Sequence, residues 1–387
     1  MKWEKKKLCE CTEYITDGDH QPAPKADKGV HFIKIKDIVN NQVSFDAQVY
    51  VPQEYYDNLP MERKPQKEDV LYTVVGSFGI PSYVQTDELF CFERNIALLH
   101  PNKDIEPRFL YYSLKNPAFY KGVEIVANGS AQKLIPLSKL KDLKILVPDK
   151  EAQRHIADIL SAYDDLIENN QKQIKLLEEA ARRLYKEWFV DLRFPGHENT
   201  KIVDGVPEGW SVYPFSSKVD IMSGGTPKTS IPDYYNGKIP FYTPKDSDGA
   251  FFAYKTQINI TEGGLKNCNS RLYPPKTVII TARGTVGKTT ILAVPMAMNQ
   301  SCYALKMKEN DAPYYLFFAL NNEIKALQTM ANGGVFNTII GKTFDSINIQ
   351  IPKDPLIYGF EKTVRPFMEQ IKNKLQANSK LVEARDR

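Results

Sequence analysis

Residues 282–289 come nearest in this sequence to a known catalytic pattern. The stretch Ala282-Arg-Gly-Thr-Val-Gly-Lys-Thr289 matches a relaxed phosphate-binding loop, with alanine in place of the first glycine. A true phosphate loop is followed by a helix whose N-terminus faces the phosphates. Here Lys288 is followed by β-branched residues and then by Pro295, which predicts a strand. We therefore predict a tight turn between strands, with glycines at positive φ, and keep a nucleotide-hydrolysing enzyme as an alternative.

Other groups of reactive side chains lack the spacing of a site. Cys9, Cys11, His20 and His31 are metal-ligand types, but their spacing is not that of a zinc site. The run Tyr-Pro-Pro-Lys that begins at Tyr273 lacks the polar first residue and the aromatic last residue of an adenine methyltransferase loop. The sequence offers no Ser/His/Asp set and no paired carboxylates. We therefore expect no bound metal and no catalytic residues.

Composition predicts a soluble protein of two or three domains. The chain has 387 residues, of which 42% are hydrophobic and 25% charged. No apolar run approaches the length of about 18 residues that a membrane helix needs. The first residues lack the apolar segment of a secretory signal. The five cysteines are therefore expected to be reduced thiols in the cytoplasm.

Charge permits DNA binding without requiring it. Residues 1–148 carry 20 basic and 20 acidic side chains, whereas residues 211–352 carry 14 basic and 9 acidic ones. A local patch would have to supply the phosphate contacts.

Polar side chains near glycine-containing turns are the candidate DNA contacts, because Lys and Arg bind phosphates while Asn, Gln and Arg can read base edges. Each of them taken alone is more often a solvated surface residue. The candidates in the first half are Lys34, Lys36, Ser77, Gln132 and Lys133, and those in the second half are Lys228, Lys245, Arg283, Thr285, Lys288 and Asn337.

The sequence contains an internal duplication. Five blocks recur in the same order at separations of 204 to 209 residues. Three of the matches are Gly18 with Gly225, Lys36-Asp37 with Lys245-Asp246, and the Gly-x-x-Gly step at Gly76 with that at Gly284. Each copy ends in an alternating strand, with Leu143, Ile145 and Val147 in the first copy and Ile347, Ile349 and Ile351 in the second, followed by a proline.

A long helix with a coiled-coil pattern follows each copy. Apolar residues recur at 4-3 spacing, which is the period of 3.5 residues that a coiled coil requires. The first series is Ile156, Leu160, Tyr163, Ile167, Asn170, Ile174, Leu177, Ala181, Leu184 and Trp188, and the second is Phe360, Val364, Phe367, Ile371, Lys374, Asn378 and Leu381. The polar entries Asn170 and Lys374 weaken packing but can fix register.

These elements predict an α+β protein with two tandem globular α/β domains. The two long helices are expected to pair as an antiparallel coiled coil, which would give the molecule a pseudo-two-fold axis. About 35 helical residues make a rod of about 50 Å. The alternative is that each helix packs on the core of its own domain. The expected segments are a first domain at 1–149, a first helix at 150–191, a linker at 192–209, a second domain at 210–353 and a second helix at 354–387.

This layout resembles the specificity subunits of type I restriction-modification enzymes. The junction from Glu187 to Trp210, EWFVDLRFPGHENTKIVDGVPEGW, is similar to the family's link between its first helix and second domain. The Gly-x-x-Gly steps and the Asn-Gly turns at Asn128 and Asn332 also fit. The resemblance implies that each domain is a target recognition domain for one half of a split DNA sequence. It further implies that the helices set the unread spacer and dock two methyltransferase subunits.

The resemblance also implies which partners carry the chemistry. The chain itself would bind double-stranded DNA, with no cofactor of its own and no membrane. S-adenosylmethionine, ATP and Mg²⁺ are expected on the methyltransferase subunits and on the restriction/translocase subunits. The second helix stops at Arg387, whereas members of the family run on through a further tail, so either the natural chain continues past Arg387 or the second docking surface is incomplete. A protein-binding adaptor remains the alternative from another functional class.

Overall fold

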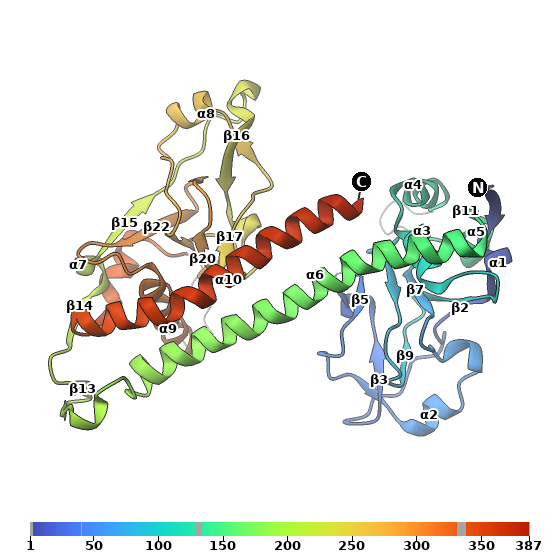
Figure 1. Ribbon diagram of the computed structural model, residues 1–387, viewed down its shortest axis with the longest axis horizontal. Coiled ribbons are helices and arrows are strands. Elements are labelled where there is room, and N and C mark those ends of the chain that lie inside the picture. The colour runs from blue at the N-terminus through green and yellow to red at the C-terminus, as the bar shows by residue number, and fades with distance from the viewer. Residues whose placement is uncertain (1–2, 40, 128–133, 331–337, 387) are drawn as a thin grey trace. The chain divides into compact units, whose positions relative to one another are not determined.

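The computed structural model describes residues 3–39, 41–127, 134–330 and 338–386 (Figure 1). Its contacts divide the chain into unit 1, residues 1–165, and unit 2, residues 166–387. Three of the candidate DNA contacts, Gln132, Lys133 and Asn337, lie outside the described residues.

Unit 1 is built on an antiparallel sheet whose strands run in the order β2-β10-β7-β8. Helices cover one face, where Tyr72 and Leu99 pack against Leu110, and a small second sheet covers the other, where Leu71 packs against Phe90. Because both faces are buried, the central strands are continuously apolar. The main strands are β2 (Thr12–Asp17), β7 (Val70–Thr73), β8 (Pro81–Tyr83) and β10 (Ile96–Pro101); the second sheet has β3 (Val30–Ile33), β6 (Tyr50–Val51) and β9 (Phe90–Phe92); the helices are α1 (Leu8–Cys11), α3 (Pro107–Lys115), α4 (Pro117–Val126) and α5 (Leu137–Asp142).

Unit 2 repeats this topology with one further strand. Its sheet order is β15-β22-β19-β20-β17, and a second sheet has the order β18-β16-β21. The parallel pair β3–β9 of unit 1 has its counterpart in β16–β21. The elements are β15 (Val219–Ser223), β16 (Tyr235–Tyr242), β17 (Phe252–Ala253), β18 (Asn259–Ile260), β19 (Val278–Thr281), β20 (Thr289–Leu292), β21 (Ala297–Met298) and β22 (Cys302–Met307), with helices α7 (Phe215–Lys218), α8 (Glu262–Lys266) and α9 (Pro313–Met330).

The matching topologies confirm the duplication, but one residue match was wrong by one position. A Cβ atom on Gly18 would lie 2.2 Å from the carbonyl oxygen of Phe92. The same clash occurs at Gly224, 2.2 Å from the carbonyl oxygen of Asn299, whereas Gly225 faces Asn269. Gly18 therefore corresponds to Gly224, not to Gly225. In both units the chain passes so close to a neighbouring strand that no side chain fits.

The alternating strands before the two prolines are confirmed. β11 (Lys144–Val147) pairs antiparallel with β1 (Glu4–Lys7), and β23 (Asn348–Ile351) pairs in the same way with β14 (Ser211–Pro214). The first and last strands of each copy are thus joined. The long helices α6 (Lys150–Tyr185) and α10 (Asp354–Asp386) begin directly after these strands, and a π-helical turn, Lys186–Val190, extends α6.

The first turns of each long helix pack on the domain that precedes them. In unit 1 the side chain of Gln153 accepts a hydrogen bond from Glu106 N at 2.9 Å, and Tyr112 donates one to Asp164 at 2.9 Å. In unit 2, Glu361 accepts a hydrogen bond from Tyr315 N at 2.8 Å. The alternative interpretation, a helix on its own domain's core, is therefore right for these turns.

The later part of α6 pairs with α10 in antiparallel orientation (Figure 1). The rings of Trp188 and Phe360 lie 6.0 Å apart, and Asn170 is hydrogen-bonded to Asn378, so residue numbers rise along one helix as they fall along the other. The antiparallel pairing is confirmed over this stretch. Of the predicted series, Ile167, Ile174, Phe360, Val364 and Ile371 are buried; Ile156, Leu160, Tyr163, Leu177, Leu184, Phe367 and Leu381 are half-buried.

Aromatic side chains hold the junction that follows α6. Phe189, Phe194 and Trp210 belong to the main core of unit 2, and the rings of Phe194 and Trp210 lie 5.2 Å apart. Within the described part of the chain, no helix combines the length and the apolar character needed to cross a membrane.

Candidate nucleic-acid interface

A tight turn joins β7 and β8 in unit 1, and we name residues 74–79 the first glycine turn. Its backbone is held by Thr73, whose hydroxyl donates to the carbonyl oxygen of Ser77 at 2.7 Å and accepts from Ile80 N at 3.0 Å. Gly79 N donates to the Thr73 carbonyl at 2.8 Å. The turn therefore has a fixed shape, with Ser77 exposed at its tip.

The same turn joins β19 and β20 in unit 2, and we name residues 282–287 the second glycine turn. Thr281 takes the place of Thr73: its hydroxyl donates to the Thr285 carbonyl and accepts from Lys288 N at 3.0 Å. Gly287 N donates to the Thr281 carbonyl at 2.9 Å. Arg283, Thr285 and Lys288 are all exposed.

The prediction of a tight glycine turn is confirmed. The φ angles are 69° and 83° at Gly76 and Gly79, and 78° and 80° at Gly284 and Gly287, a region that glycine enters at little cost. Lys288 is followed by the strand β20 instead of a helix. The phosphate-loop geometry that the sequence pattern suggested is therefore absent at this turn.

A short 3₁₀ turn carries the candidate lysine of each unit. In η1 (Ile35–Asp37), Asp37 accepts a hydrogen bond from Lys34 N at 2.9 Å. In η6 (Pro244–Asp246), Asp246 accepts hydrogen bonds from the backbone and the hydroxyl of Thr243, both at 2.8 Å. The aspartates point inward, which leaves Lys36 and Lys245 exposed; Lys34 is half-buried.

In unit 2 the glycine turn and the 3₁₀ turn are in contact. The hydroxyl of Thr285 donates to the carbonyl oxygen of Pro244 at 3.2 Å, so the turn that carries Arg283 contacts the turn that carries Lys245. Exposed cations on two turns in contact can bind phosphates of a DNA strand. Lys228 lies elsewhere, in the loop between β15 and β16.

The chain returns to each glycine turn after a segment outside the described residues. In unit 1, Ile135 N donates to the Val74 carbonyl at 2.9 Å, and in unit 2, Ile339 N donates to the Ala282 carbonyl at 2.9 Å. In unit 2 the glycine turn therefore contacts both the 3₁₀ turn and the segment at Ile339, and in unit 1 the glycine turn contacts the matching segment at Ile135.

Sequence reasoning missed Gln257, which completes the second 3₁₀ turn. Gln257 N donates to Asp246 at 2.7 Å, and its side-chain amide donates to the Lys245 carbonyl at 3.3 Å. Gln257 is exposed, and its amide group is of the type that reads adenine. No periodicity or turn signal distinguishes it from other surface glutamines.

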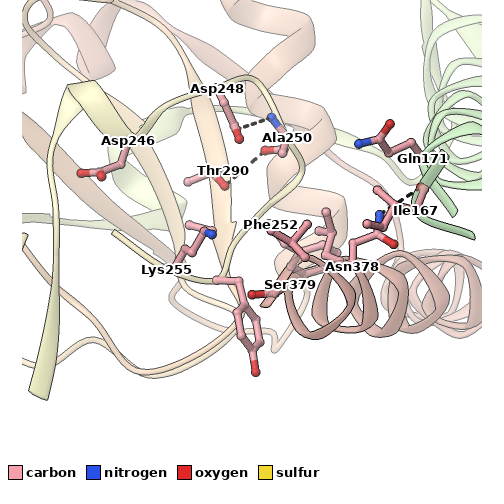
Figure 2. A pocket seen from close by; sticks show the side chains of 14 residues that line it. Ile167, Gln171, Asp246, Asp248, Ala250, Phe252, Lys255, Thr290, Asn378 and Ser379 are labelled. Carbon is pink, nitrogen blue, oxygen red and sulfur yellow. Dashed lines mark hydrogen bonds between the residues drawn. The ribbon is translucent and has the colours of Figure 1, made fainter. Parts of the chain in front are cut away.

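A pocket of about 260 Å³ lies behind this turn (Figure 2). Its polar lining comes from both long helices, from η6 and the segment after it, and from β20. The polar side chains of the lining include Gln171, Asp246, Asp248, Lys255, Asn378 and Ser379. Within the described residues, His, Cys, Asp and Glu side chains form no group of three that could hold a metal ion.

Comparison with known proteins gives a consistent result. Residues 1–179 and 207–378 match a family model described as the type I restriction modification DNA specificity domain. The chain is 28% identical to the type I restriction enzyme MjaIX specificity subunit of Methanocaldococcus jannaschii, over 76% of this chain and 69% of that protein. It is 24% identical to the type I restriction enzyme HindI specificity subunit of Haemophilus influenzae, over 92% of each chain.

A solved structure shares the fold. The S subunit of the type I restriction-modification system from M. genitalium superposes with a TM-score of 0.64 at 18% identity, covering 100% of this chain and 94% of that one.

Proposed function

The chain belongs to the family of type I restriction modification DNA specificity proteins, and on that basis we propose that it selects a DNA sequence in two halves, one for each copy of the duplicated domain. The glycine turn and the 3₁₀ turn of each domain contact one half. The long helices set the length of the unread spacer between the halves, and they dock two methyltransferase subunits.

The observation that carries this proposal is the repeated pair of turns. Thr73 and Thr281 make the same three hydrogen bonds around a turn with the same glycines, although little else in the two turns is alike. The exposed residues differ: Ser77 stands in the first turn where Thr285 stands in the second, and Lys288 corresponds to Ile80. A common frame with different exposed side chains is suited to reading two different half-sites.

We assign no chemical step to this chain. Methyl transfer with S-adenosylmethionine, and cleavage and translocation with ATP and Mg²⁺, belong in this proposal to the methyltransferase and restriction subunits, within the cytoplasm. The chain contributes the positioning that places the target adenines at the active sites of its partners.

The test is to map methylated adenines by single-molecule sequencing in cells that express the chain with its methyltransferase partner. We expect a split motif with a fixed spacer. Replacing residues 1–149 by the corresponding domain of a family member should change one half of the motif and leave the other half unaltered.

Two other results would contradict the proposal. Binding of the purified chain to a protein target, with no preference among DNA duplexes, would favour the adaptor. An ATPase activity of the pure chain that Lys288→Ala abolishes would favour the nucleotide-hydrolysing enzyme.

A further inference from the structure

The segment from Pro244 to Gln257 is fixed at both of its ends. At the first end, Thr243 binds Asp246, and at the second end Gln257 binds the same aspartate and the Lys245 carbonyl. This segment, which we name the recognition loop, carries Lys245 and contacts the second glycine turn through Pro244. Any displacement of the loop therefore displaces the candidate DNA contacts.

The middle of the recognition loop is attached to the first long helix. Glu178 of α6 accepts a hydrogen bond from Phe251 N at 3.5 Å, and the guanidinium of Arg182 lies 4.5 Å from the centre of the Phe251 ring. Arg182 also pairs with Glu178 at 3.4 Å. Burial raises the pKa of the Glu178 carboxyl, against the opposing effects of Arg182 and the Phe251 N–H. Two charged groups of one helix turn thus hold one residue of the loop.

Phe251 also connects the recognition loop to the main sheet. The residue is 2% exposed, and the centre of its ring lies 4.9 Å from that of Phe317 in α9. Its carbonyl oxygen accepts a hydrogen bond from Ile291 N at 2.8 Å, and β17 then continues parallel to β20. Strand β20 begins at the residue after Lys288. Phe251 is therefore linked to both turns that carry the candidate contacts.

Next to this attachment the loop and the helices are separated by a pocket. Figure 2 shows Asp246 and Asp248 of the loop on one side and Gln171 of α6 and Asn378 of α10 on the other. The contacts of Glu178 and Arg182 with Phe251 lie beside this pocket, and Phe251 and Phe252 also share an apolar core with Ala181 of α6.

The hydrogen bonds of α6 in unit 1 are made to different elements. There Tyr112 of α3 donates a hydrogen bond to Asp164 of α6. Gln153 of α6 accepts one from the backbone N–H of Glu106, the residue before α3. The helix that follows the first domain thus holds the recognition loop of the second domain.

Resting on the proposed function, we propose that Glu178 and Arg182 are positioning residues for the second half-site: they hold Phe251, and with it the recognition loop, in the conformation that reads DNA. They do not touch DNA themselves. Their loss should therefore affect the choice of bases in the second half-site and leave the first half-site unaffected.

The experiment compares Glu178→Ala, Glu178→Gln and Arg182→Ala in the full chain with its methyltransferase partner. The matched control is Glu179→Ala, which removes the neighbouring exposed ion pair with Arg183 at 2.7 Å. Methylation rates are measured on targets that carry one base change in either half. In parallel, amide hydrogen exchange is followed for residues 244–257 of the purified chain.

With Glu178→Ala and Arg182→Ala we expect discrimination to fall about tenfold in the second half-site, the worth of a single mismatched base pair, with no change in the first. Exchange across 244–257 should rise. Glu178→Gln keeps an acceptor for Phe251 N and should retain most of the discrimination, and Glu179→Ala should match the wild type.

Equal losses in both halves, or unchanged discrimination with Glu178→Ala, would overturn the inference while leaving the proposed function intact. A wild-type complex without any preference for a split sequence would overturn the proposed function, and this inference with it.

Discussion

The side-chain amide of Asn170 donates a hydrogen bond to Asn378 at 2.8 Å, across the seam between α6 and α10 and 208 residues along the chain. Asn378 in turn donates to the Ile167 carbonyl at 3.4 Å. Asn170 is only 8% exposed. An amide pair in an apolar seam, with Asn170 buried and Asn378 half-buried, lowers stability but favours the one register in which both amides are paired.

We expect Asn378→Leu to destabilise unit 2 by about 1–3 kcal/mol, because it leaves the buried Asn170 amide without its partner. The double variant Asn170→Leu/Asn378→Leu should be at least as stable as the wild type, since it replaces both amides by apolar groups. Urea unfolding of the wild type, the double variant and the two single variants, Asn170→Leu and Asn378→Leu, measures the coupling between the two sites. Additive effects of the two substitutions would contradict a paired interaction.

Much of the architecture could be predicted because it depends on local patterns. The duplication, the alternating strands before Pro148 and Pro352, and the helical periodicity after them are all visible in short stretches of sequence. The glycine turns were predictable because Gly284 and Gly287 follow an apolar strand at the spacing of a tight turn.

The contacts that join distant segments could not be predicted. The 4-3 pattern runs unbroken from Ile156, although Ile156 itself is only half-buried and the next residue, Ala157, is buried in its place. Periodicity gives the apolar positions of a helix and does not say which neighbour covers them. The bond between Glu178 and Phe251 spans 73 residues and follows no repeat, because the second copy has Val382 where the first has Glu178.

Glu361 should make stability depend on pH. It is 3% exposed, and burial raises the pKa of its carboxyl to about 7, although the N–H groups of Tyr315 and Tyr314 oppose this. In the unfolded chain its pKa returns to 4.5, so the folded state holds a proton that the unfolded state releases between these values. The contribution of the protonated Glu361 to the free energy of unfolding is therefore fully present below pH 4.5 and is lost as pH rises through about 7. It amounts to on the order of 3 kcal/mol.

Glu361→Gln keeps an oxygen that accepts from Tyr315 N and removes the charge. Relative to the wild type it should be more stable at pH 8 than at pH 5, as measured by urea unfolding at both values. The exposed Glu187→Gln serves as the control and should show no such difference. Equal stability of Glu361→Gln and the wild type at pH 8 would mean that the Glu361 carboxylate is not destabilised by burial.

Lys245 and Arg283 should contact phosphates. We expect each alanine substitution to weaken binding of the full chain to its target, and each to reduce the slope of log affinity against log salt by about 1. Fluorescence anisotropy over a range of salt concentrations measures both effects. Lys201→Ala, in the exposed linker, is the control. An unchanged slope for both variants would place the phosphate contacts elsewhere.

The threonines that hold the glycine turns provide a matched pair of variants. Thr281→Val keeps a β-branched side chain but removes the hydroxyl that binds Thr285 and Lys288, and Thr73→Val does the same in the first domain. Each change should cost about 1–3 kcal/mol of stability, because backbone groups lose a partner. Thr281→Val should relax base choice in the second half-site and Thr73→Val in the first, so each variant controls for the other. Methylation rates on targets with single base changes measure base choice in each half-site. Relaxed base choice in the other half-site, with either variant, would contradict the prediction.

The helix pair should set the length of the spacer. Helix α6 is continuous from Lys150 to Tyr185, and the bond between Asn170 and Asn378 defines which positions face each other. A heptad inserted after Gln171 keeps the 3.5-residue phase of α6, and in an antiparallel pair its match is a heptad after Gln376. Seven helical residues add about 10 Å, which corresponds to about 3 base pairs of DNA.

The doubly extended chain should therefore methylate the same two half-sites with a spacer about 3 base pairs longer. Mapping of methylated adenines gives the spacer directly. The control inserts seven glycine and serine residues between Asp204 and Gly205, at the exposed hairpin of β12 (Ile202–Val203) and β13 (Val206–Pro207). It adds the same number of residues outside the helices and should leave the spacer unchanged. If the hairpin insertion changed the spacer and the heptads did not, the linker would set the spacing in place of the helices.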